Sequence, residues 1–181
     1  MAGRVDGKVA LVTGGGSGIG QATALALARE GATIVVADVI VDGGEATVKR
    51  IQNGGGEAVF IKTDVAQETD AEAMVQHAVD TYGRLDCAFN NAGIAGAAAR
   101  TSEYTQAQWD RVIAINLTGG WLCMKYEIQQ MLTQGGGAIV NTASVAGLVG
   151  FRSGPAYVAA KHGVVGLTKT AALEYAKAGI R

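Results

Sequence analysis

The sequence is short of net charge and of long apolar runs, and each shortage excludes a class of protein. The formal net charge of its 181 residues is −1, and no run of Lys and Arg is longer than two. It therefore offers no electrostatic basis for binding nucleic acid or an anionic membrane surface. No apolar stretch reaches membrane-spanning length, and the first residues lack the layout of a signal peptide. We expect a soluble, cytoplasmic protein.

Cysteine and aromatic residues are also scarce. The two cysteines, Cys87 and Cys123, lie in apolar segments without CxxC spacing, so we expect reduced packing residues and no metal site. Aromatic residues make up 6% of the chain, whereas 49% of it is hydrophobic. The core is therefore expected to consist mainly of Ala, Val, Ile and Leu, within a single domain over residues 1–181.

Short β-branched runs alternate with longer segments of helical period. Strands are predicted at residues 9–13, 33–38, 58–62, 87–90 and 138–142, and helices at residues 21–30, 45–52, 68–82, 106–132 and 156–176. Strands that are apolar throughout and separated by helices are typical of a parallel sheet covered on both faces. We predict one doubly wound α/β domain with three layers, α/β/α.

A glycine-rich loop joins the first predicted strand to the first predicted helix. Residues 13–20 read Thr-Gly-Gly-Gly-Ser-Gly-Ile-Gly. Here a pyrophosphate can approach the backbone without meeting a Cβ, and the start of the helix favours an anion. The loop alone could be an ordinary tight turn, but its place after the first strand favours a Rossmann-like dinucleotide site.

Asp38 closes the second predicted strand, eighteen residues after Gly20. Its carboxylate can accept hydrogen bonds from the ribose diol of a dinucleotide, although it could also be a solvated side chain at a strand end. It would repel a 2′-phosphate about 4 Å away by roughly 4 kcal/mol at an effective dielectric constant of about 20. The next residues, Val39 and Ile40, supply no cation. We therefore predict NAD rather than NADP as the cofactor.

Ser144, Tyr157 and Lys161 form a second candidate site. Tyr157 and Lys161 are four residues apart on a predicted helix and share one face, and Ser144 follows the fifth predicted strand, at the edge where α/β sheets bind ligands. Alcohol oxidation needs a base, and an adjacent ammonium together with NAD⁺ makes a tyrosinate plausible, since a nearby cation lowers the pKa of an acid by about 1–3 units. The serine hydroxyl could hydrogen-bond the reacting oxygen. Alone, a Tyr/Lys pair at this spacing is common by chance.

Together these motifs resemble those of the short-chain dehydrogenase/reductase family, over nearly the whole chain. Residues 13–20 resemble its T-G-x-x-x-G-x-G loop, residues 90–93 match its N-N-A-G segment, and Tyr157 and Lys161 match its Y-x-x-x-K pair. The resemblance implies an NAD-dependent oxidoreductase that transfers a hydride between NAD(H) and a secondary alcohol or ketone, as a homo-oligomer (a dimer or a tetramer). The positions that resemble the family's cofactor-binding residues are Gly14, Ser17, Gly18, Ile19, Gly20, Asp38, Asp64, Val65, Asn90, Ala92 and Gly93, with Tyr157 and Lys161.

The resemblance also implies catalytic roles for four residues. Tyr157 would be the acid/base and Ser144 would position the substrate oxygen. Lys161 would bind the nicotinamide ribose and favour the ionised form of Tyr157, and Asn116 would hold a proton-relay water.

From the residues alone, several of these positions have simpler interpretations. Asn116 could be a structural residue that bends its helix. Asp64 could cap the following helix. Asn90 and Asn91 could merely satisfy backbone groups at the end of a strand.

The family's sixth strand, substrate lid and seventh strand have no counterpart in these residues. We therefore expect the fifth strand to form an apolar sheet edge, and the 181-residue chain alone to be unstable or nearly inactive. Three alternatives stay open: a non-catalytic NAD-binding fragment of a longer dehydrogenase, an NADP-dependent ketoreductase, and an S-adenosylmethionine methyltransferase. The last would have no use for Ser144, Tyr157 and Lys161.

Overall fold

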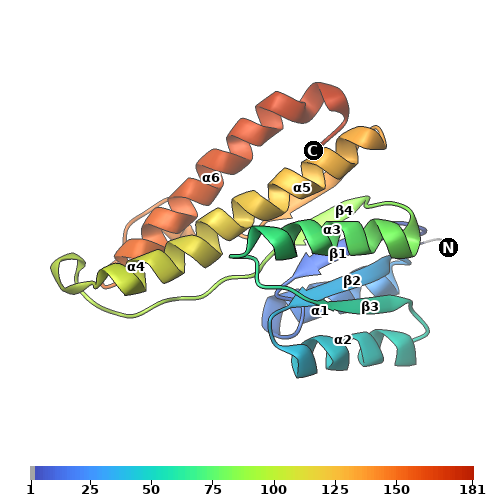
Figure 1. Cartoon of the computed structure of the whole chain (residues 1–181), viewed down its shortest axis with the longest axis horizontal. Coiled ribbons are helices and arrows are strands. Elements are labelled where there is room, and N and C mark those ends of the chain that lie inside the picture. The colour runs from blue at the N-terminus through green and yellow to red at the C-terminus, as the bar shows by residue number, and fades with distance from the viewer. Residues whose placement is uncertain (1–2) are drawn as a thin grey trace.

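The computed structural model describes residues 3–181, in which strands and helices alternate (Figure 1). The strands are β1 Val9–Thr13, β2 Thr33–Asp38, β3 Ala58–Lys62, β4 Cys87–Asn90 and β5 Ala138–Asn141. The helices are α1 Gly18–Arg29, α2 Val41–Asn53, α3 Glu68–Tyr82, α4 Gln106–Ile113, α5 Gly119–Thr133 and α6 Pro155–Tyr175, with a π-helix, Ala114–Thr118, between α4 and α5.

The five strands form one parallel sheet in the order β3-β2-β1-β4-β5. β2 and β3 lie on one side of β1, and β4 and β5 lie on its other side. This reversal leaves a crevice at the carboxyl ends of β1 and β4, where open α/β sheets bind ligands. The predicted fold class, a Rossmann-like doubly wound sheet, is confirmed.

Alternate residues of each central strand serve the two faces of the sheet, as the two-residue period of a strand requires. Val9 and Leu11 of β1 pack in the cluster that contains buried residues of α3 and α5 and the partly buried face of α6. Ala10 and Val12 pack in the cluster with α1 and α2. Figure 1 shows these helices on the two faces of the sheet. Burial on both faces explains why the strands are apolar throughout.

The predicted helix at residues 106–132 is not one regular α-helix. It is divided by the π-helix Ala114–Thr118, although α4 and α5 still run as one continuous rod in Figure 1. α4 begins at a capping box, in which the side chain of Thr105 accepts from the backbone of Gln108 and the Gln108 side chain accepts from the backbone of Thr105. Two other helices begin three or four residues earlier than predicted, α1 at Gly18 and α2 at Val41.

The edge of the sheet at β5 is partly covered by the last described residues. Ile139 N–H donates to the carbonyl of Arg181 (2.8 Å), and Arg181 N–H donates to the carbonyl of Gly137 (3.0 Å). Ile180 forms a parallel bridge with Gly137. β5 is the last strand of the sheet, as expected. The final residues pair with its first half, whereas Val140 remains 59% exposed. Within residues 3–181, no helix is both long and apolar enough to cross a bilayer.

Candidate active site

An open cleft of about 470 Å³ lies at the carboxyl ends of β1 to β4. It contains most of the residues that the sequence suggested for cofactor binding. The lining residues are Gly14, Ser17, Gly18, Ile19, Asp38, Val39, Thr63, Asp64, Val65, Asn91, Ala92, Gly93, Ile94, Arg111 and Ile115.

The geometry of the loop explains why glycine occupies each of its three fixed positions. Gly14 and Gly18 have positive φ values of 64° and 52°, in the left-handed region that favours glycine. A Cβ on Gly20 would collide with the carbonyl oxygen of Gly14. Ser17 is the N-cap residue of α1, but its side chain makes no capping hydrogen bond. The first N–H groups of α1 are therefore available to an anion in the cleft.

Asp38 stands beside this loop at the end of β2. Its Oδ2 accepts from Gly16 N–H (2.8 Å) and its Oδ1 accepts from Ile40 N–H (2.9 Å). These two hydrogen bonds fix the carboxylate at the rim of the cleft and leave further lone pairs on both oxygens. The Asp38 carboxylate is thus a hydrogen-bond acceptor in a fixed orientation, and not a freely solvated side chain at the end of a strand.

The N-N-A-G segment is tied to β1 by Thr13, a residue that the sequence reasoning did not single out. Thr13 Oγ1 accepts from the backbone N–H of both Asn91 (3.0 Å) and Ala92 (3.1 Å). The Asn91 amide in turn donates to the carbonyl oxygens of Thr13 and Gly14. The simpler interpretation, a residue that satisfies backbone groups, therefore describes Asn91. It does not describe Asn90, whose amide donates to the side chains of Glu127 and Asn141.

Asp64 is not the cap of α3. Its Oδ1 accepts from Ala66 N–H (3.0 Å) and its own N–H donates to Asp70 Oδ2 (2.9 Å), whereas the N-cap residue is Gln67. The carboxylate thus closes a local turn at the rim of the cleft.

Asn116 is buried inside the π-helix and holds the segment after β4. Its Oδ1 accepts from Ile94 N–H (2.8 Å) and its Nδ2 donates to Ile94 O (2.7 Å). π-helical turns are frequent at functional sites. Each polar atom of the side chain makes one hydrogen bond in this backbone contact, so the second hydrogen of Nδ2, the second lone pair of Oδ1 and the main chain are left to serve a water molecule.

Tyr157 and Lys161 lie on the same side of α6, as their spacing predicts. Lys161 Nζ is 5.7 Å from the centroid of the Tyr157 ring and donates to the carbonyl oxygen of Thr142 (2.7 Å). The Lys161 side chain is buried, with 4% of the residue exposed, and burial lowers its pKa. Ser144 Oγ accepts from Ala146 N–H (3.1 Å), which holds the oxygen at the carboxyl end of β5. The neighbouring His162 is exposed.

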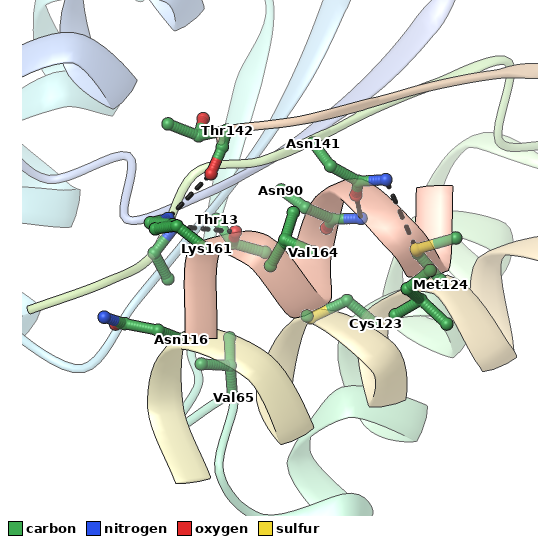
Figure 2. A pocket seen from close by; sticks show the side chains of 13 residues that line it. Thr13, Val65, Asn90, Asn116, Cys123, Met124, Asn141, Thr142, Lys161 and Val164 are labelled. Atoms are coloured by element: carbon green, nitrogen blue, oxygen red, sulfur yellow. Dashed lines mark hydrogen bonds between the residues drawn. The ribbon is translucent and has the colours of Figure 1, made fainter. Parts of the chain in front are cut away.

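A small cavity of about 20 Å³ lies below Lys161, and Figure 2 shows the side chains around it. Its polar lining residues include Lys161, Asn116, Thr142, Asn90 and Asn141, and the rest of the lining is mainly apolar. Thr142 Oγ1 and Asn90 Oδ1 are buried without a hydrogen-bond partner. The cavity exceeds the volume of about 10–15 Å³ that one water needs, and the polar groups in its lining suit a water molecule.

Sequence reasoning also missed Glu127, which is fully buried on α5 and bonded to Asn90. One signal was present. Glu127 interrupts a helix face on which Cys123, Ile128 and Met131 are otherwise apolar and buried.

Comparisons with known proteins agree with this geometry. Residues 8–181 match the short chain dehydrogenase family. The chain is 50% identical over 181 residues to a cyclohexanol dehydrogenase from Acinetobacter sp. (strain SE19), covering 100% of this chain and 72% of that protein. It is 44% identical over 180 residues to a levodione reductase from Leifsonia aquatica, covering 98% of this chain and 67% of that protein.

A solved structure of a similar protein gives the same result. The crystal structure of an NAD⁺-bound xylitol dehydrogenase superimposes with a TM-score of 0.96 at 41% identity, covering 98% of this chain and 68% of that one. These proteins are oxidoreductases of alcohols and ketones by their names. The chain belongs to the short-chain dehydrogenase/reductase family of oxidoreductases.

Proposed function

We propose that the protein transfers a hydride between NAD(H) and a secondary alcohol or ketone, with Tyr157 as the acid/base. The observation that carries the proposal is the position of Lys161 Nζ, 5.7 Å from the Tyr157 ring centroid on one face of α6. A cation so placed would attract the negative charge that develops on the phenol oxygen during proton transfer. The S-adenosylmethionine methyltransferase alternative leaves this pair without a role.

The cleft fits a dinucleotide without a 2′-phosphate. A pyrophosphate would lie on the loop around Gly14 and Gly18, at the N-terminus of α1. The ribose of the adenosine would meet Asp38, which is held by Gly16 and Ile40. Asp38 would repel a phosphate at that place, which favours NAD over NADP. The NAD⁺-bound state of the xylitol dehydrogenase supports the same cofactor.

When bound, NAD⁺ supplies the hydride acceptor. During oxidation the substrate hydroxyl would lie between Ser144 and Tyr157, and Tyr157 would take its proton as the hydride leaves the carbon. Ser144 would donate a hydrogen bond to the oxygen on which the charge changes. Lys161 would stabilise the phenolate and contact the ribose. Asn116, through the small cavity, would help return the proton to solvent by way of a water molecule.

The surroundings of Ser144 favour uncharged, largely apolar substrates. Val145, Leu148, Val149 and Phe151 are each more than half exposed, and the Phe151 ring is 6.3 Å from the Tyr157 ring. A carbon ring could bury its surface against them. The names of the cyclohexanol dehydrogenase and the levodione reductase agree with cyclic alcohols and ketones as the first compounds to test.

A single substitution tests the proposal. Tyr157→Phe removes the hydroxyl and keeps the ring, so turnover of a cyclic alcohol such as cyclohexanol, followed by NADH absorbance, should fall by about 100-fold or more. The dissociation constant for NAD⁺ should stay within about twofold. Tyr175→Phe, on the same helix and packed against the hydrophobic core, is the matched control. Equal activity of the Tyr157 variant and a wild type that is active in the same assay would overturn the proposal.

A further inference from the structure

Glu127 on α5 is a fully buried carboxyl group without a cationic partner among residues 3–181. It is 0% exposed, and none of the ion pairs of the described residues includes it. An unpaired buried acid is costly, and here burial raises the pKa of Glu127 to about 7 despite a hydrogen bond from Asn90. Such a group needs an explanation, and its contacts supply one.

The carboxyl group binds the last residue of β4. Glu127 Oε2 accepts from Asn90 Nδ2 (2.9 Å), and the same nitrogen donates to Asn141 Oδ1 (3.0 Å). Because an amide nitrogen has two hydrogens, both are now used. Asn141 Nδ2 continues the network to Thr168 on α6 (3.0 Å). The orientation of the Asn90 amide is therefore fixed from two sides.

This orientation leaves Asn90 Oδ1 as the one uncommitted polar atom of its side chain. It is buried without a partner, and Asn90 lines the small cavity below Lys161 (Figure 2). Thr142 Oγ1, in the same cavity wall, is also buried without a partner. Lys161 Nζ uses one of its three hydrogens on the Thr142 carbonyl. A water molecule in the cavity could accept from the ammonium and donate to the two orphan oxygens.

We propose that Glu127 is a positioning residue: by accepting a hydrogen bond from Asn90, it turns Asn90 Oδ1 toward the cavity, where this oxygen holds a water molecule against Lys161. Without an acceptor at position 127, only Asn141 Oδ1 holds the amide, so the amide can rotate. A rotated amide would present its NH₂ group to the cavity, and the water would then lose one of the two oxygens to which it donates. The consequence for turnover rests on the proposed function, whereas the water site does not.

Two substitutions of similar size separate this role from packing. Glu127→Gln keeps a side-chain oxygen that can accept from Asn90, and Glu127→Met keeps the volume but removes the acceptor. Met131→Leu, a buried apolar position one turn further along α5, is the matched control. For Glu127→Met we expect kcat to fall by about tenfold, the effect of one lost hydrogen bond. KM and the dissociation constant for NAD⁺ should stay within about twofold, and the melting temperature should not fall.

Glu127→Gln and Met131→Leu should both retain the kcat of the wild type. A Met variant with wild-type kcat would overturn the proposal. So would a Gln variant as impaired as the Met variant, because the acceptor would then not be what matters. A fall in melting temperature parallel to the fall in kcat would assign Glu127 a purely structural role.

A crystal structure at a resolution that shows ordered water tests the site without any assay of activity. In the wild type and in Glu127→Gln we expect one water within hydrogen-bonding distance of both Asn90 Oδ1 and Lys161 Nζ. In Glu127→Met that water should be absent or the Asn90 amide rotated. An empty cavity in the wild type would overturn the inference even if the protein is an active dehydrogenase. An occupied cavity in a protein without dehydrogenase activity would overturn the proposed function alone.

Discussion

The buried acid on α5 makes the stability of the protein depend on pH in a calculable way. Burial raises the pKa of Glu127 from 4.5 to about 7, so the folded state binds this proton more tightly than the unfolded state does. Its stabilising contribution is then fully present below pH 4.5 and is lost as the pH rises through about 7. At about 1.4 kcal/mol per pH unit, the difference between 4.5 and about 7 amounts to about 3 kcal/mol.

Glu127→Gln isolates this contribution, because glutamine resembles the neutral acid and does not titrate. The free energy of unfolding of the wild type and the variant is measured by urea denaturation at several pH values between about 4.5 and 8.5. Other titrating groups are common to both proteins and cancel in the difference. We expect similar stability at the acidic end and a variant that is more stable by about 3 kcal/mol at the alkaline end.

The result that would refute this reasoning is a difference that does not change with pH. A constant difference would mean that Glu127 has the same proton affinity in the folded and unfolded states. The carboxyl group would then have to be solvated, in conflict with its burial. A wild type that gains stability relative to the variant at high pH would instead require a cation beside the carboxylate.

Two further predictions concern the cofactor cleft. Asp38→Asn removes the charge but keeps an acceptor oxygen, so the preference for NAD⁺ over NADP⁺, measured as a ratio of dissociation constants, should fall by about tenfold or more. Asp42→Asn, in the first turn of α2, should leave this ratio unchanged. An unaltered ratio in the Asp38 variant would show that this carboxylate does not select the cofactor. Gly20→Ala places a methyl group against the carbonyl of Gly14 and should lower the free energy of unfolding by about 1–3 kcal/mol. Gly166→Ala, at an open helical position of α6, should raise the free energy of unfolding by up to about 1 kcal/mol. Equal melting temperatures for the two variants would show that a methyl group at position 20 does not collide with the Gly14 carbonyl.

The strands and the glycine loop could be predicted from the sequence because local chemistry determines them. A buried parallel strand needs an uninterrupted apolar run, and the predicted bounds 9–13, 33–38, 58–62 and 87–90 coincide with β1 to β4. Gly14, Gly18 and Gly20 stand where only glycine avoids strain or collision. The spacing of Tyr157 and Lys161 likewise requires one helix face, and the structure places them there.

Features that depend on contacts between distant segments could not be predicted in this way. The π-helix Ala114–Thr118 adds one residue to a turn, which barely alters an apolar period read over a long segment. The bridge between Gly137 and Ile180 involves too few residues to show a pattern. Asn90 and Glu127 are separated by 37 residues, and no periodicity relates a strand end to the middle of a later helix. An acidic residue on an apolar helix face marks Glu127 as unusual, but nothing in the sequence identifies Asn90 as its hydrogen-bond partner.

Asn90 links the two buried ionisable groups of this region, because it donates to Glu127 and lines the small cavity together with Lys161. Burial raises the pKa of Glu127 and lowers that of Lys161, so burial disfavours the charged form of each group. A protonated carboxyl group still has an oxygen that accepts a hydrogen bond. A neutral Glu127 can therefore orient Asn90 as an ionised one does, without placing an uncompensated anion in the core. The proposed role of Glu127 thus depends on its hydrogen bond and not on its charge, which is why Glu127→Gln should preserve it.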